Sequence, residues 1–548
     1  MMEKRTLANN MNTASGVLVE AGKRVITERL FDNIIPSVNV EEHKNCTSHI
    51  HDLEYYSIAY NCIGISARQV IGERRYSFAT ALSRLHRSLS TITTNQAGGI
   101  GNITADTDLA YYLGNESDDE IIESFCILFE NLNLYSRKGC EKPYITFNIG
   151  LDTSNGGRRV TKLMLEAFLR GDSDGHPFIF PNIVFKLRSV VNLDEDSPNH
   201  DLYMLAAKVT SQRMIPTYFN CDHSNNSAFP PELIGIMGCR SRVAANLNGD
   251  MGAVGRGNIA CSTINLPQLA LRSGNSVDEF RDLVRQVMDH TSELLIHRFN
   301  TLCRSELVPE IKDMGIYMDC ENDDATEMFR NGTLSVGFIG LWDAVSILYD
   351  VKLSSADEYS KYFSKAYEIV EMMSCFIKEK SQETGMNFSL LASAAEGVTG
   401  RFAEYDSAHY GSNVNVCNRG FYTNSFHIPV DADMHFMDKI NLEAPFHKLC
   451  DGGCITYVEF SEIPGMNTEA VMEAIRYAYD KDCNYFGINF PLDCCNICGW
   501  NGSTVHRCPL CGSDNITRLR RVSGYLSKDI SFTDGKRAEL ALRRNHFD

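Results

Sequence analysis

Long apolar runs are absent from this 548-residue sequence, and no stretch reaches the length that a membrane-spanning helix needs. Basic residues are also in deficit: 52 lysines and arginines face 70 aspartates and glutamates, for a net charge of −18. Such a chain has no general affinity for nucleic acid or for an anionic membrane, although a local basic pocket can still hold phosphate groups. The first ten residues, MMEKRTLANN, include no apolar signal segment, so we expect no secretion.

Cysteine, in contrast, is plentiful. The 19 cysteines are scattered through a large chain and do not resemble the framework of a small disulfide-rich secreted protein. In cytosolic proteins cysteines more often bind metals, take part in redox reactions or pack in the core. We therefore expect a reducing, cytoplasmic location.

Short apolar segments alternate with helical patterns along most of the chain. This alternation predicts an α/β protein whose strands are covered on both faces. We find no short-period repeat and no low-complexity linker before residue 490. Helices are predicted near 16–35, 67–94, 157–170, 199–213, 276–306, 355–381 and 467–482. Strands are predicted at 60–65, 144–150, 178–187, 214–220, 387–393, 421–427, 454–460 and 485–490.

The composition changes after residue 490, where Cys, Gly, Asn and Asp dominate. Two Cys-x-x-Cys pairs, separated by nine residues, can offer four thiolates tetrahedrally to Zn²⁺; they are Cys495, Cys498, Cys508 and Cys511. Four sulfurs leave no open coordination position, which favours a structural metal over a catalytic one. The alternatives are unligated surface cysteines, or Cys494 in place of Cys495.

Just beyond these cysteines lies RLRRVSGYLS (518–527), which matches the short signature of a glycyl radical around Gly524. A radical on a glycine Cα can become planar, because no Cβ collides with the flanking peptide groups, and it is delocalised over them. The alternative is an ordinary turn glycine.

The zinc-ribbon pattern directly before RRVSGYL does not stand alone. Nine further strings occur in the order in which one protein family carries them. They are HIHD (49–52), NC (61–62), MGCRS (237–241), GRGNIACSTINLP (255–267), SVGFIGL (335–341), FYTNSFH (421–427), APFH (444–447), GGCITYVE (452–459) and FGINFPLD (486–493). From about residue 20 onward, the chain resembles the catalytic subunit of the anaerobic (class III) ribonucleoside-triphosphate reductases, which are glycyl radical enzymes.

The resemblance implies a ten-stranded α/β barrel made of two antiparallel halves, each of five parallel strands. A finger loop with MGCRS at its tip would thread the centre. We expect residues 1–490 to form this catalytic barrel, 491–514 the zinc ribbon, and 515–548 the glycyl radical loop and C-terminal tail.

The resemblance also implies a division of roles. Gly524 would store the radical, and the Cys239 thiyl would remove the 3′-hydrogen of the ribose. Cys62 would donate hydrogen to C2′, and the Asn258 amide would bind ribose hydroxyls. Taken alone, either cysteine is more simply a buried packing residue.

Substrate contacts are expected from two further segments. His49 matches a histidine near the family active site, although a hydrogen-bonded structural histidine fits as well. In LLASAAEGVTGRF (390–402), backbone amides such as that of Ala394 suit substrate phosphates. Ser393 would add its hydroxyl, or would simply cap the following helix.

The sequence also departs from its relatives. Leu391 stands where some members have an active-site tyrosine, and Ser523 where some have cysteine. Only 48 residues precede HIHD, so we expect no ATP-cone module and no overall activity control by dATP. GGIGN (98–102) faintly resembles an effector-loop string.

The implied partners are a radical-SAM activase, which uses S-adenosylmethionine and an iron–sulfur cluster, a second copy of the chain, nucleoside triphosphates and dNTP effectors. Formate is the expected reductant, and a thioredoxin-type donor reducing a Cys62–Cys239 disulfide is the alternative.

Two rival functions stay open: a glycyl radical enzyme of the pyruvate formate-lyase type, and a zinc-ribbon interaction protein. Those lyases lack the four-cysteine ribbon and carry a second cysteine adjacent to the first in the finger loop.

Overall fold

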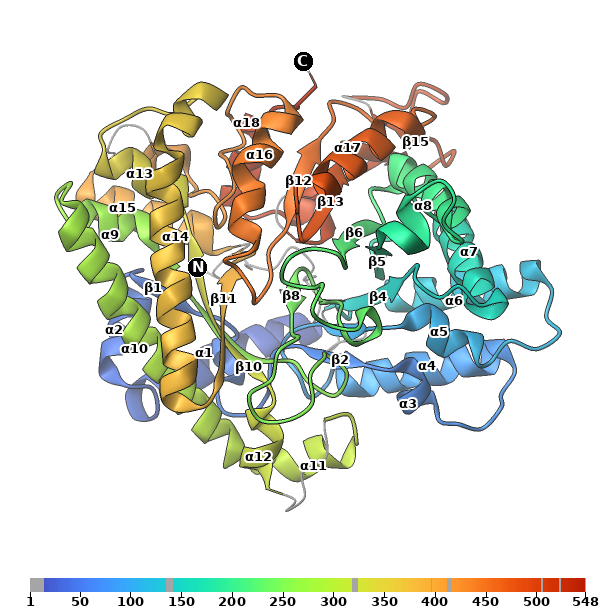
Figure 1. Ribbon diagram of the computed structural model, residues 1–548, viewed down its shortest axis with the longest axis horizontal. Helices are drawn as coiled ribbons and strands as arrows, with labels where there is room; N and C mark the ends of the chain where they lie inside the picture. Colours follow the sequence, from blue (N-terminus) through green and yellow to red (C-terminus); the bar gives the residue numbers. More distant parts are fainter. Residues whose placement is uncertain are drawn as a thin grey trace.

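The computed structural model describes residues 14–134, 141–317, 324–395, 397–411, 416–503, 506–521 and 524–547. Strands lie at the centre, and helices form an outer shell on both sides (Figure 1). The fold is therefore the predicted mixed α/β arrangement. Within the described ranges, no helix combines the length and the apolar composition that crossing a bilayer requires.

The first half of the core contains five neighbouring parallel strands: β2 (Ile63–Ile65), β3 (Ile100–Asn102), β4 (Ile145–Ile149), β5 (Asn182–Leu187) and β6 (Thr217–Asn220). Every residue of these strands is buried, which is why their sequences do not alternate between apolar residues and exposed polar ones. The helices beside them in Figure 1 are α4 (Phe78–Ile92), α5 (Ala105–Ala110), α6 (Asp118–Leu132), α7 (Asn155–Arg170) and α8 (His200–Arg213).

The second half contains β9 (Asn258–Asn265), β10 (Thr333–Ile339) and β11 (Asn387–Ala392), which are parallel, and the parallel pair β12 (Thr456–Glu459) and β13 (Tyr485–Asn489). An additional strand, β1 (Ser48–Ile50), lies antiparallel to β9. The main covering helices are α10 (Val277–Cys303), α14 (Ala356–Thr384), α16 (Phe436–His447) and α17 (Thr468–Asp480).

The two halves meet at both edges. β13 pairs with β6 in antiparallel direction. At the other edge, the backbone N–H of Cys62 donates to the carbonyl of Asn258 at 2.9 Å. A parallel bridge between Leu391 and Gly453 links β11 to the segment that enters β12. The five parallel strands of the first half are thus present, and in the second half one bridge joins the three strands β9–β11 to the pair β12–β13. A second set of five strands and closure into one ten-stranded barrel stay predictions.

A short hairpin lies between the two halves. It consists of β7 (Ile236–Met237) and β8 (Ser241–Arg242), and we call residues 236–242 the finger hairpin. The Asn148 side chain on β4 bonds both backbone groups of Ile236, at 2.9 and 3.0 Å. On the opposite side, the backbone N–H of Arg242 donates to Gly452 at 3.0 Å. Figure 1 accordingly shows β8 between β4 and β11, as expected for the finger loop.

Glycines allow the hairpin to approach the first half closely. A Cβ built on Gly99 would lie 2.7 Å from the Cα of Gly238, and one on Gly101 would lie 2.7 Å from the carbonyl oxygen of Ile236. Gly238 itself has a φ of +59°, which disfavours other residues. The GGIGN string (98–102), which faintly resembled an effector loop, therefore forms the surface on which the finger hairpin packs, and we call these residues the seat of the hairpin.

The C-terminal region forms a separate antiparallel sheet in the order β15 (Asn501–Gly502), β14 (Leu492–Cys495), β16 (Ile516–Arg521) and β17 (Leu526–Lys528). This sheet spans the boundary expected between 491–514 and 515–548, and the three-part division stays a prediction.

The final helix, α18 (Asp534–Leu542), leads into a tail that docks on β12. The Arg543 guanidinium bonds the carboxylates of both Glu459 and Glu539. The His546 N–H donates to the Glu459 carbonyl at 3.0 Å, and Phe547 packs on Phe460 with ring centroids 4.0 Å apart. The tail is thus fixed by polar and apolar contacts.

Two secondary-structure predictions are wrong. No strand forms at 421–427: the Thr423 N–H donates to the Asp343 carboxylate at 2.7 Å, and Ser425 has a φ of +43°. These contacts hold the segment as a loop. The helix expected over 67–94 is interrupted between α3 (Ala67–Ile71) and α4.

The seat of the finger hairpin generates a stability prediction. Gly99→Ala would place a methyl group against backbone atoms of Gly238 and Tyr144 that cannot rotate away, so we expect a loss of about 1–3 kcal/mol. Gly22→Ala is the control, because α1 (Ala14–Asn33) leaves space within 4 Å of that position. In a thermal melt, Gly99→Ala should lower Tm, and Gly22→Ala should leave it unchanged or slightly raised; equal melts would contradict the close approach.

Candidate active site

The loop that carries Gly524 reaches the tip of the finger hairpin. The neighbouring Tyr525 stacks on Tyr144 with centroids 5.0 Å apart, and its hydroxyl lies 2.9 Å from a Cβ built on Gly238. The Tyr457 hydroxyl on β12 donates to the carbonyl oxygen of Gly524 at 3.4 Å. Gly524 is therefore held between the hairpin tip and β12.

Cys62 lies directly before β2 and is 5% exposed. Its sulfur accepts a hydrogen bond from the Gly99 N–H at 3.3 Å, and its S–H donates to the Asn61 side-chain oxygen at 2.9 Å. Burial raises the pKa of the Cys62 thiol to about 12. At neutral pH this residue is a thiol, which suits hydrogen donation better than attack as a thiolate.

Cys239 is half-buried at the hairpin tip, between Gly238 and Arg240. A Cβ built on the neighbouring Gly238 would lie 3.8 Å from the Cys62 sulfur, so the hairpin tip lies close to Cys62. The next residue, Arg240, is 1% exposed, and its guanidinium donates to the Ala392 carbonyl at 3.2 Å. The structure thus brings Cys62, Cys239 and Gly524 together around one hairpin, and their chemical roles stay predictions.

Asn258 lies at the start of β9, beside Cys62. Its Nδ2 donates to the hydroxyls of Thr333, at 3.2 Å, and Ser335. Its Oδ1 is buried and has no hydrogen-bond partner in the described part of the chain. Buried acceptors are normally satisfied, so this oxygen is available to a hydroxyl group of a bound molecule.

His49 contacts a residue that the sequence did not point to. Arg401 on α15 (Val398–Tyr410) donates to His49 Nδ1 at 2.8 Å. The His49 ring stacks on His43 and meets His51 edge-on, with centroids 5.0 and 4.8 Å apart. Burial lowers the pKa of His49, so the ring is neutral and Arg401 carries the charge.

Ser393 and Ala394 follow β11, as expected, but Ser393 does not cap a helix. The N-cap of α15 is Gly397, four residues later and without a side-chain cap bond. The Ser393 hydroxyl instead bonds Thr263 at 2.6 Å, and Thr263 also bonds His51 at 2.7 Å. The N-cap interpretation is therefore wrong, and sequence reasoning missed the Thr263 and His51 contacts.

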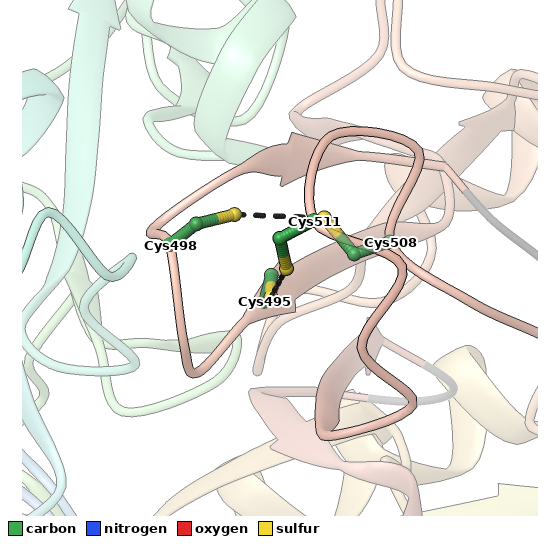
Figure 2. A group of neighbouring side chains, drawn as sticks. All are labelled: Cys495, Cys498, Cys508 and Cys511. Atoms are coloured by element: carbon green, nitrogen blue, oxygen red, sulfur yellow. Dashed lines mark hydrogen bonds between the residues drawn. The ribbon is translucent and has the colours of Figure 1, made fainter.

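The four cysteines beyond residue 490 form one cluster (Figure 2). Their sulfurs all lie within 4.8 Å of one another, and the Cys495–Cys511 and Cys498–Cys508 pairs are each 3.5 Å apart. Zn–S bonds of 2.3 Å imply S–S separations of about 3.8 Å in a tetrahedron, so the cluster fits a metal ion. Cys494 lies outside the group and cannot replace Cys495 in this arrangement.

Comparison with known proteins agrees with this geometry. A family model described as anaerobic ribonucleoside-triphosphate reductase matches residues 7–546. The chain is 27% identical to the reductase of that name from enterobacteria phage T4, over 95% of this chain and 93% of the phage protein. It is 28% identical to the Escherichia coli K12 protein of the same name, over 94% of this chain and 79% of that one.

Among solved structures, the chain superposes on an anaerobic ribonucleotide reductase from Thermotoga maritima in complex with dATP and CTP, with a TM-score of 0.75. The alignment covers 96% of this chain and 92% of that one at 15% identity, so it supports the fold alone. The match of the family model over nearly the whole sequence, together with the hairpin, the Gly524 loop and the cysteine cluster, leads to one conclusion: this chain belongs to the anaerobic ribonucleoside-triphosphate reductase family of glycyl radical enzymes.

Proposed function

We propose that the protein reduces ribonucleoside triphosphates to 2′-deoxyribonucleoside triphosphates by radical chemistry in the absence of oxygen, and so supplies DNA precursors. The family match gives the reaction class. The observation that carries the proposal is the seating of the Gly524 loop against the finger hairpin that bears Cys239, beside Cys62.

The residues divide the chemistry into storage and use. The Gly524 radical takes the hydrogen atom of the Cys239 S–H, so a C–H bond forms at Gly524 and a thiyl at Cys239. The thiyl removes the ribose 3′-hydrogen, and the Cys239 thiol so formed returns it to C3′ at the end of the cycle. The 2′-hydroxyl then leaves as water with one proton, and Cys62 donates hydrogen to C2′. Two electrons must enter from outside.

Substrate binding is assigned to the interior ends of β9 and β11. The unpartnered Oδ1 of Asn258 would accept a hydrogen bond from a ribose hydroxyl. The Ser393 hydroxyl and the backbone amide of Ala394 would face the phosphates, with the Arg401 charge and His49 nearby. The Arg401 charge, local in an otherwise acidic protein, supports this assignment.

The proposed reductant is formate. The balance is then NTP + HCOO⁻ + H⁺ → dNTP + CO₂ + H₂O. A dithiol donor that reduces a Cys62–Cys239 disulfide is the alternative. The further partners we propose are a radical-SAM activase with S-adenosylmethionine and an iron–sulfur cluster, which removes the Gly524 hydrogen, a second copy of the chain, and dNTP effectors. We propose a cytoplasmic location.

Zinc is the proposed metal of the cysteine cluster. Cys495, Cys498, Cys508 and Cys511 would hold it, and with four sulfurs its contribution is structural. Cys495 ends β14, and β14 pairs with β16, the strand that leads toward Gly524. The cluster therefore stabilises the sheet that presents the radical loop.

Turnover itself tests the function. Purified protein, activated without oxygen, should convert CTP to dCTP with formate as reductant; the same assay with a dithiol in place of formate identifies the donor. Acyl cleavage of pyruvate in place of CTP reduction would favour the lyase-type glycyl radical enzyme and overturn the proposal.

Storage and use of the radical are separable by substitution. Gly524→Ala adds a Cβ that crowds a planar radical, so we expect no stable EPR signal. Cys239→Ala and Cys62→Ala leave the storage site intact and should give the glycyl doublet with no dCTP. EPR and dCTP yield are measured on the same samples. Turnover in Cys239→Ala, or a doublet in Gly524→Ala, would contradict these roles.

The metal site is tested by Cys508→Ser, with Cys375→Ser as an exposed cysteine control outside the cluster. Because metal binding is coupled to local folding, Cys508→Ser should lose zinc and radical yield while the core still melts cooperatively. Elemental analysis and EPR report the two losses. A zinc content equal to that of Cys375→Ser would refute the ligand assignment.

A further inference from the structure

Two side chains that have had no role so far, Asn61 and Asp52, are linked to the Cys62 sulfur by hydrogen bonds. The Cys62 S–H donates to Asn61 Oδ1 at 2.9 Å. The Asn61 Nδ2 in turn donates to a carboxylate oxygen of Asp52. The three residues form one hydrogen-bonded chain that runs from the residue before β2 to the turn after β1.

The Asp52 carboxylate can only accept hydrogen bonds, and this fixes which atom donates in each of the two hydrogen bonds. An ionised carboxylate has no hydrogen to donate, so the Asn61 amide must present its Nδ2 to Asp52 and its Oδ1 to the thiol. The Gly99 N–H approaches the same sulfur at 3.3 Å as a donor. The Ser241 hydroxyl lies 3.9 Å from the sulfur, so Asn61 Oδ1 is the nearer of the two oxygen acceptors. The Gly99 donor and the Asn61 acceptor together orient the S–H bond.

The backbone at Asp52 is strained, and a buried cation holds it. Asp52 has φ +48° and ψ +47°, a left-handed conformation that is uncommon outside glycine. The guanidinium of Arg298, which is 1% exposed, donates to the carbonyls of His51 at 2.7 Å and Asp52 at 3.2 Å. A strained backbone conformation persists only where surrounding contacts hold it, and such places are typically functional sites.

We propose that Asp52 and Asn61 are positioning residues for the Cys62 thiol, acting by aligning its S–H bond for transfer to the substrate. This inference rests on the proposed function. In the step concerned, the S–H bond of Cys62 breaks and a C–H bond forms at C2′. The sulfur is left one hydrogen atom short, and the external reductant, formate or a dithiol, returns it.

The test uses Asn61→Leu, which keeps similar volume and removes the acceptor. Asn115→Leu, the same change at an exposed loop position, is the control. Misaligned reacting groups lose large rate factors, so kcat for dCTP should fall about tenfold or more. KM for CTP and the glycyl radical yield should match those of the control, because Asn61 contacts neither the phosphates nor Gly524. CTP should also be consumed without an equal yield of dCTP.

Substitution of Asp52 separates positioning from mere packing. Asp52→Asn keeps an oxygen that can accept from Asn61 Nδ2 and should retain most of kcat. Asp52→Leu should reproduce the loss in Asn61→Leu, and the double variant should be no worse than either single one, because both act through the same bond. Additive losses in the double variant would overturn the inference.

The outcomes distinguish the inference from the function beneath it. Wild-type protein that makes no dCTP overturns both. Given wild-type turnover, an unchanged kcat in Asn61→Leu overturns the inference alone. A fall in radical yield equal to the fall in kcat, seen also in Asn61→Ala, would assign Asn61 a structural role and overturn it as well.

Discussion

The close approach of the finger hairpin to β3 is the constraint on which the site depends. Gly99 and Gly101 let backbone pack on backbone, and Gly238 supplies the left-handed turn at the tip. Any side chain at these positions would move Cys239 away from Cys62 and from the Gly524 loop. Three residues distant in sequence therefore meet because a few positions lack a Cβ.

The interior of the second half contains polar side chains, and many of them form hydrogen bonds with one another. The Ser335 and Ser389 hydroxyls bond each other at 2.8 Å, as do those of Thr263 and Ser393 at 2.6 Å. Buried polar groups are costly only when unpaired, so such an interior is stable and still suited to a nucleotide. Asn258 has one of the open acceptors among the described residues, and it lies where the reaction is proposed to occur.

The sequence predicted the elements whose signals are local. Apolar runs indicated β4, β5 and β13, and the Cys-x-x-Cys spacing indicated a cluster that the structure forms. β9 and β10 were not predicted, because their inward Ser, Thr and Asn residues interrupt the apolar pattern. The loop at 421–427 resembled a strand because its aromatic residues are buried, although its backbone bonds Asp343. The Arg401–His49 pair joins positions 352 residues apart, and no local pattern specifies such a contact.

The docked tail has a consequence for access to Gly524. On one side the loop continues from β16, which is paired in the C-terminal sheet; on the other, the chain runs through α18 to Arg543, which is bound by Glu459 and Glu539. Separating Arg543 from both carboxylates leaves buried charges that water must solvate. Exposure of Gly524 through the tail is therefore a collective event, whose equilibrium depends on ionic strength and on the simultaneous loss of both carboxylate contacts of Arg543.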